Sequence, residues 1–91
     1  MTKKEMMKKV EDLREGVMRL GAYASEAEYM GMPWEADAAM QMQRDYFDEI
    51  EELKEKIKKI DELENHLYML ELHGCYEEAH YVALDIAEIE K

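Results

Sequence analysis

The sequence predicts an all-α protein of three antiparallel helices, in which short turns fold two flanking helices back along a long central helix. Three observations lead to this prediction: apolar residues recur at helical spacing along most of the 91 residues, the chain has one proline, and two glycine-centred breaks divide it. We expect a single helical domain over residues 1–91. Its helices should span about residues 2–30, 33–72 and 76–90.

The first helix should begin at a capping box. Thr2 and Glu5 have the spacing at which a hydroxyl and a carboxylate satisfy free backbone donors of a helix start. Apolar residues then follow at alternating steps of four and three, which keeps one seam of the helix against a partner helix. This seam consists of Met6, Val10, Leu13, Val17, Leu20, Ala24 and Ala27.

Each predicted turn centres on a glycine. Gly31 and Gly74 can adopt the left-handed conformation that ends a helix, and Pro33 suits the first position of the next helix. Residues 74–79 (GCYEEA) resemble the G-x-Y-x-E-A turn of tetratricopeptide helical hairpins, and residues 31–36 (GMPWEA) echo that turn 43 positions earlier. The rest of the roughly 34-residue repeat of that family is missing. The resemblance therefore implies a shared way of turning a helix and no shared function.

The central helix carries the longest apolar seam. Together with the first helix it gives a core or dimer seam that we assign to Met6, Val10, Leu13, Val17, Leu20, Ile50, Leu53, Ile57 and Ile60. Met40, Phe47, Tyr68 and Met69 lie off this seam, so the central helix is apolar over more than one face. In the third helix, Ala79, Val82, Ile86 and Ile89 should point inward.

The helix lengths predict a homodimer. At the usual rise per residue the three helices are about 45, 60 and 22 Å long, so the flanking helices cover different halves of the central one. A single copy would then be two helices thick, whereas two copies complete a four-helix cross-section. The alternative is a central helix bent near Asp61, which would give a compact three-helix monomer.

The charge of the chain points to a basic protein partner. The formal net charge is −11, so we expect no direct binding to nucleic acid, which requires clustered Lys and Arg. We expect the acidic third helix to neutralise the cations at positions 54–59. No apolar run is long enough for a membrane span, and one cysteine suits a reducing compartment, so we expect a cytoplasmic protein with no membrane contact.

Two surfaces are candidates for the partner. Asp45, Asp48, Glu49 and Glu52 form a carboxylate stripe on one face of the central helix, and we add Glu35 and Asp37 to this acidic face. Trp34, Tyr23, Tyr29 and Met30 gather at the first turn, with a composition enriched at protein contacts. The alternatives are a solvated acidic face and an aromatic cap over the end of a small core.

The sequence offers no catalytic, cofactor or metal site that we would assign. His73, Cys75 and His80 surround the second turn, and Glu77 and His80 have the E-x-x-H spacing of di-iron bundles. That motif occurs once, without a second copy. We therefore expect a non-enzymatic protein without cofactor or metal.

These observations together predict a small acidic interaction module, an inhibitor or adaptor that binds a basic protein surface such as that of a nucleic-acid-binding protein. In size and charge it is similar to phage-encoded anti-restriction and anti-CRISPR inhibitors, a comparison of class without a shared motif. An oligomerisation scaffold without inhibitory role is the alternative. A small metal-dependent helical enzyme is a remote third.

Overall fold

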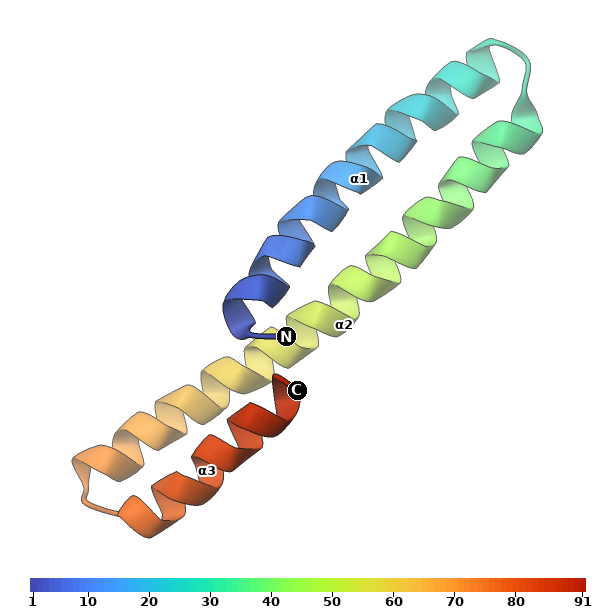
Figure 1. Cartoon of the computed structure of the whole chain (residues 1–91). Coiled ribbons are helices and arrows are strands. Elements are labelled where there is room, and N and C mark those ends of the chain that lie inside the picture. Colours follow the sequence, from blue (N-terminus) through green and yellow to red (C-terminus); the bar gives the residue numbers. More distant parts are fainter.

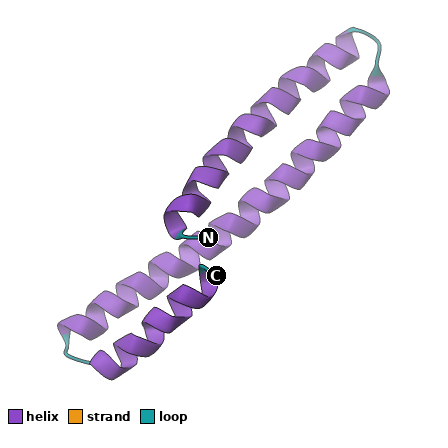
Figure 2. Cartoon of the chain, viewed as in Figure 1, coloured by secondary structure: helices purple, strands orange, loops and turns teal.

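The structure, a computed structural model that describes residues 1–91, consists of three α-helices and no strands. The helices are α1 (Lys3–Tyr29), α2 (Pro33–Leu72) and α3 (Tyr76–Ile89). Figure 1 shows α1 and α3 folded back along opposite halves of α2, and Figure 2 shows that only short loops lie outside the helices. The expected all-α class is therefore confirmed. No helix is long and apolar enough to cross a membrane.

The start of α1 is the expected capping box. The Glu5 backbone N–H donates to Thr2 Oγ1, and the Thr2 backbone N–H donates to Glu5 Oε1, both at 3.2 Å. This backbone donor lowers the pKa of the Glu5 carboxyl below its ordinary value. The cap thus fixes the first turn of α1 from local sequence alone.

Both turns use the same geometry. Gly31 and Gly74 each have φ of +76°, the left-handed conformation that glycine adopts without strain. The backbone N–H of the third residue after each helix donates back to a carbonyl oxygen of that helix at 2.8 Å, from Met32 to Ala27 and from Cys75 to Leu70. The repeated sequence pattern at the two turns therefore corresponds to a repeated backbone structure.

The molecule is a rod. Its extents are 65 × 16 × 14 Å, and its radius of gyration of 19.4 Å compares with about 12 Å for a compact domain of this length. Both flanking helices pack on α2 and not beside each other. Helix α2 is continuous through Asp61, so the alternative of a bent central helix in a compact three-helix monomer is wrong.

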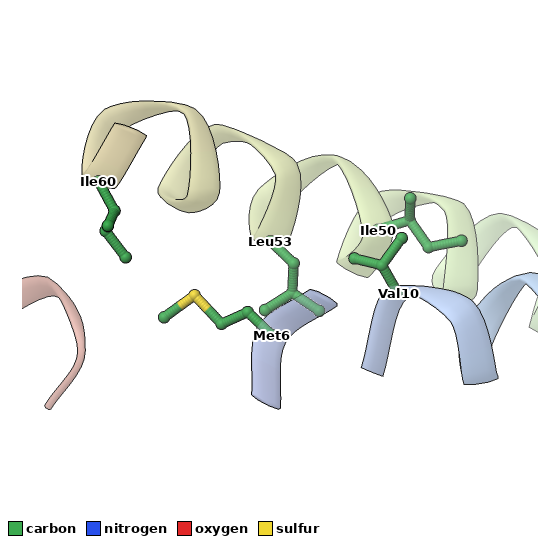
Figure 3. Packing of buried hydrophobic residues seen from close by; sticks show 5 residues of the cluster. All are labelled: Met6, Val10, Ile50, Leu53 and Ile60. Carbon is green, nitrogen blue, oxygen red and sulfur yellow. The ribbon is translucent and has the colours of Figure 1, made fainter. Parts of the chain in front are cut away.

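The core is a thin layer between α2 and its neighbours. One cluster contains Met6, Val10, Ile50, Leu53 and Ile60, and Figure 3 shows these side chains between the start of α1 and the middle of α2. A second cluster near the first turn is made only of small residues, namely Ala24, Ala27, Ala36 and Ala39. The remaining members of the predicted seam, Leu13, Val17, Leu20 and Ile57, pack against these clusters. The predicted seam is thus internal to one chain.

Helices α3 and α1 meet end to end at the middle of the rod. A Glu90 carboxylate oxygen accepts from the Lys3 backbone N–H at 3.2 Å, so the end of α3 satisfies a free donor at the start of α1. The Lys3 ammonium pairs with Asp61 and Glu64 of α2, and its bond to Asp61 raises the pKa of Lys3. Ile89 packs against the same core cluster as Met6. All three helices converge only here.

Candidate protein-interaction surfaces

Most of the acidic stripe lies on the solvent-facing side of α2. Asp45, Asp48 and Glu52 are exposed, and neither Asp48 nor Glu52 forms an ion pair or hydrogen bond within the chain. Asp45 accepts only from Gln41, at 3.3 Å. Asp37 is also exposed and lies eight residues before Asp45, which places it on the same side of the helix. These four carboxylates form a single solvent-facing surface.

Two predicted members of the acidic face have a different role. Lys9 Nζ pairs with Glu49 Oε1 at 2.8 Å, and the Tyr23 hydroxyl donates to Glu35 Oε2 at 2.8 Å. Both contacts connect α1 to α2 along one flank of the hairpin. Glu35 and Glu49 therefore hold the hairpin together and are less available to a partner than Asp45 or Asp48.

The Glu35 carboxylate raises the pKa of Tyr23 above its ordinary value of 10.0, chiefly through the hydrogen bond that it accepts. Because the neutral phenol is the donor, this bond stabilises the hairpin at neutral pH and is lost as the pH rises through the pKa of Tyr23. We expect Glu35→Gln to lower the pKa of Tyr23. An NMR titration of the tyrosine ring carbons would measure this change, and an unaltered Tyr23 midpoint would contradict the assigned hydrogen bond.

The aromatic end at the first turn is a surface and not a core cap. Trp34 is 69% exposed and Tyr29 93%, while Met30 and Tyr23 are also exposed. The core beneath them is the alanine cluster, against which Leu20 and Met32 pack. These four side chains therefore face solvent instead of packing over the end of the core.

The charges form three zones along the rod. Residues 20–52 and 61–91 each sum to −8, and residues 53–60 sum to +3. The start of α1, which carries four lysines in its first nine residues, lies beside residues 53–60. The expected neutralisation by α3 occurs only in part, because only its C-terminal half lies near these lysines, as Asp85 does to Lys59. The rod therefore has a basic middle between two acidic ends.

The structure contains no enclosed pocket of the kind that binds small molecules. Its hollows are open, and the one beside the end of α3 is lined by four lysines, three glutamates and a single apolar side chain, Ile89. No three His, Cys, Asp or Glu side chains converge as metal ligands, so His73, Cys75 and His80 do not form the small site considered above.

Comparisons with protein-family models, with characterised protein sequences and with solved structures find no match.

Sequence reasoning missed the extent of exposed apolar surface. Sixteen large hydrophobic side chains are exposed. Beyond the residues already discussed they include Met7, Met18, Met42, Leu72, Tyr76, Tyr81 and Leu84. Met42 was expected in the seam of the central helix and is 46% exposed, so that prediction is wrong. The other residues fall outside the predicted seams, but the sequence does not show on which flank each one lies, so they could not be recognised as one surface.

Proposed function

We propose that this chain is a non-enzymatic protein-interaction module, an acidic rod that forms a homodimer and binds a basic protein surface as an inhibitor or adaptor. The observation that carries the proposal is the unpaired carboxylate stripe of Asp37, Asp45, Asp48 and Glu52 on a rigid helix. A fixed row of like charges attracts an oppositely charged surface and accelerates association with it. The exposed Trp34 end supplies an apolar anchor next to this stripe.

The partner that fits this surface is a protein with a basic face, such as a nucleic-acid-acting enzyme, and the proposed inhibition would be that of an anti-restriction or anti-CRISPR-type protein. Nucleic acid itself does not fit, since both ends of the rod are acidic. We place the protein in the cytoplasm because its one cysteine, Cys75, is exposed and unpaired.

The homodimer is supported by how little of the chain is covered. Only 11 of 91 residues are buried, and only Met6 and Ile60 are large and fully buried. The cross-section contains two helices throughout, a thickness that seldom encloses a core. Pairing of two rods would give the four-helix section of a bundle.

Charge reversal tests the binding role. The basic partner is first captured from native-host lysate at low salt and identified by mass spectrometry. We then expect Asp45→Lys/Asp48→Lys/Glu52→Lys to slow association with that partner by at least about tenfold, and wild-type association to slow as salt rises, in surface plasmon resonance.

A matched control separates position from net charge. Glu71→Lys/Glu77→Lys/Glu78→Lys makes the same change in charge at the other end of the rod and should retain fast association. Equal slowing in both variants would show a non-specific charge effect. Unchanged association in the stripe variant would leave the chain as an oligomerisation scaffold.

A further inference from the structure

The rod exposes more surface than a monomer of its mass should. Its accessible surface is 6914 Å², whereas a folded monomer of 10.8 kDa exposes about 5,500 Å². The excess is roughly 1,400 Å² per copy. Two copies that hid this area against each other would bury about 2,800 Å² in total, which lies in the range of obligate homodimers.

The two flanks of the α1·α2 hairpin differ in chemistry. On one flank, Glu35 and Glu49 bind Tyr23 and Lys9, and these four side chains close it with polar contacts. Met42 lies seven residues from each glutamate and therefore belongs to this flank.

The opposite flank exposes large apolar side chains. Met40 lines a shallow hollow there together with Gln43 of α2 and with Gly21, Ala24, Ser25 and Glu28 of α1. Phe47 lies seven residues further along α2, on the same side of the helix, and is 52% exposed. We define Met40, Phe47 and Met7 of α1 as the methionine flank. One polar contact joins the two helices there, from Gln43 Nε2 to the Val17 carbonyl oxygen at 2.8 Å, and it leaves Met40 and Phe47 exposed.

The other half of the rod offers a complementary surface. The α2·α3 hairpin exposes Tyr68, Tyr76, Tyr81 and Leu84, and helix α3 is apolar well beyond the residues that face α2. Thioether groups adapt to irregular surfaces and make favourable contacts with aromatic rings. Methionine-bearing and tyrosine-bearing halves therefore fit each other better than either fits itself.

The charge order along α2 selects the direction of pairing. The midpoint of α2 lies near Leu53. An acidic run precedes this point and a basic run follows it, namely Asp45, Asp48, Glu49, Glu51 and Glu52, then Lys54, Lys56, Lys58 and Lys59. A parallel pair of rods would set each run against itself, whereas an antiparallel pair sets the acidic run of one copy beside the basic run of the other.

We infer that the homodimer is antiparallel, with the methionine flank of one copy seated on the α2·α3 hairpin of the other. This inference rests on the proposed homodimer and adds its docking surface and direction. A twofold axis near Leu53 would relate the two copies. One self-complementary interface would then cover both halves of each rod.

A pair of single substitutions tests the docking surface. We expect Met40→Glu to weaken dimerisation at least tenfold in sedimentation equilibrium, because a carboxylate would enter an apolar interface. Met42→Glu is the matched control, because it makes the same substitution two residues away on the polar flank. The wild-type side chains have similar exposure, 41% for Met40 and 46% for Met42. This control should dimerise like the wild type. Circular dichroism of both variants verifies that the helices persist.

Spin labels on Cys75 test the direction. Cys75 is exposed and lies in the turn between α2 and α3, which Figure 1 shows at one end of the rod. In the antiparallel dimer the two labels should be separated by nearly the rod length of 65 Å, and in a parallel dimer by about its width of 16 Å. Double electron–electron resonance distinguishes these distances directly.

Different results would overturn the homodimer and its docking arrangement. A wild type that stays at monomer mass at all concentrations and salt levels would overturn the homodimer itself. A dimer that persists unchanged in Met40→Glu, or that brings the Cys75 labels close together, would overturn only the surface or the direction.

Discussion

Replacing Ile60 by alanine is expected to lower the free energy of unfolding by about 2–5 kcal/mol, the largest effect of any single truncation in this chain. The Ile60 side chain is 0% exposed and lies where the start of α1 and the end of α3 converge on α2. Since domains of this kind are stable by only about 5–15 kcal/mol, the loss would be a large fraction of the total. Urea unfolding at fixed protein concentration measures it.

The control for this truncation is Leu72→Ala, which removes a similar volume from a side chain that is 64% exposed. We expect it to change the free energy of unfolding by less than about 1 kcal/mol. Equal effects of the two substitutions would contradict the placement of the core at the middle of the rod.

Alanine substitutions at Gly16 and Gly21 should have opposite effects. Both glycines lie inside α1, so alanine gains up to about 1 kcal/mol of helix propensity at each. A Cβ at Gly16 would lie 2.7 Å from the Tyr46 ring, which is partly buried against α1, and relieving that overlap costs about 1–3 kcal/mol. A Cβ at Gly21 would meet only the amide end of the Gln43 side chain, at 3.0 Å, and this side chain can shift by a few tenths of an ångström while it donates to the Val17 carbonyl oxygen. We expect Gly16→Ala to destabilise the fold and Gly21→Ala to be neutral or stabilising.

A double-mutant cycle with Tyr46→Leu isolates the contact. Once the ring is removed, Gly16→Ala should stabilise the protein by its helix propensity. Urea unfolding of the four proteins would measure the coupling. If Gly16→Ala destabilised equally in both backgrounds, Tyr46 would not be the reason for the glycine at this position.

The sequence predicts the helices and turns because their causes are local. Thr2 and Glu5 cap α1 through neighbours three residues apart, and Gly31 and Gly74 each end a helix through their own backbone freedom. The core seam follows from periodicity, since Ile60 and Met6 repeat at helical spacing with their neighbours. The rod shape follows from helix lengths and the two turn positions.

Features that depend on the register between helices were not predictable. In the sequence, nothing distinguishes Glu35 and Glu49 from the carboxylates that remain free. Only the rotation of α1 about its axis brings Tyr23 and Lys9 within reach of these two glutamates. The contact between Glu90 and Lys3 joins residues 87 positions apart. The separation of α2 into polar, methionine and acidic sides likewise emerges only once α1 is docked.

The end-to-end meeting of α3 and α1 has a mechanical consequence. Opposite α2, the row formed by α1 and α3 is covalently interrupted at the middle of the rod. Only noncovalent contacts join the two helices there, namely the hydrogen bond between Lys3 and Glu90 and the packing of Met6 and Ile89 in one core cluster. The bending stiffness of the molecule is therefore lowest at that level, around residues 57–61 of α2. Slow collective flexing should concentrate there, and each half of the rod should move as a stiff arm about it.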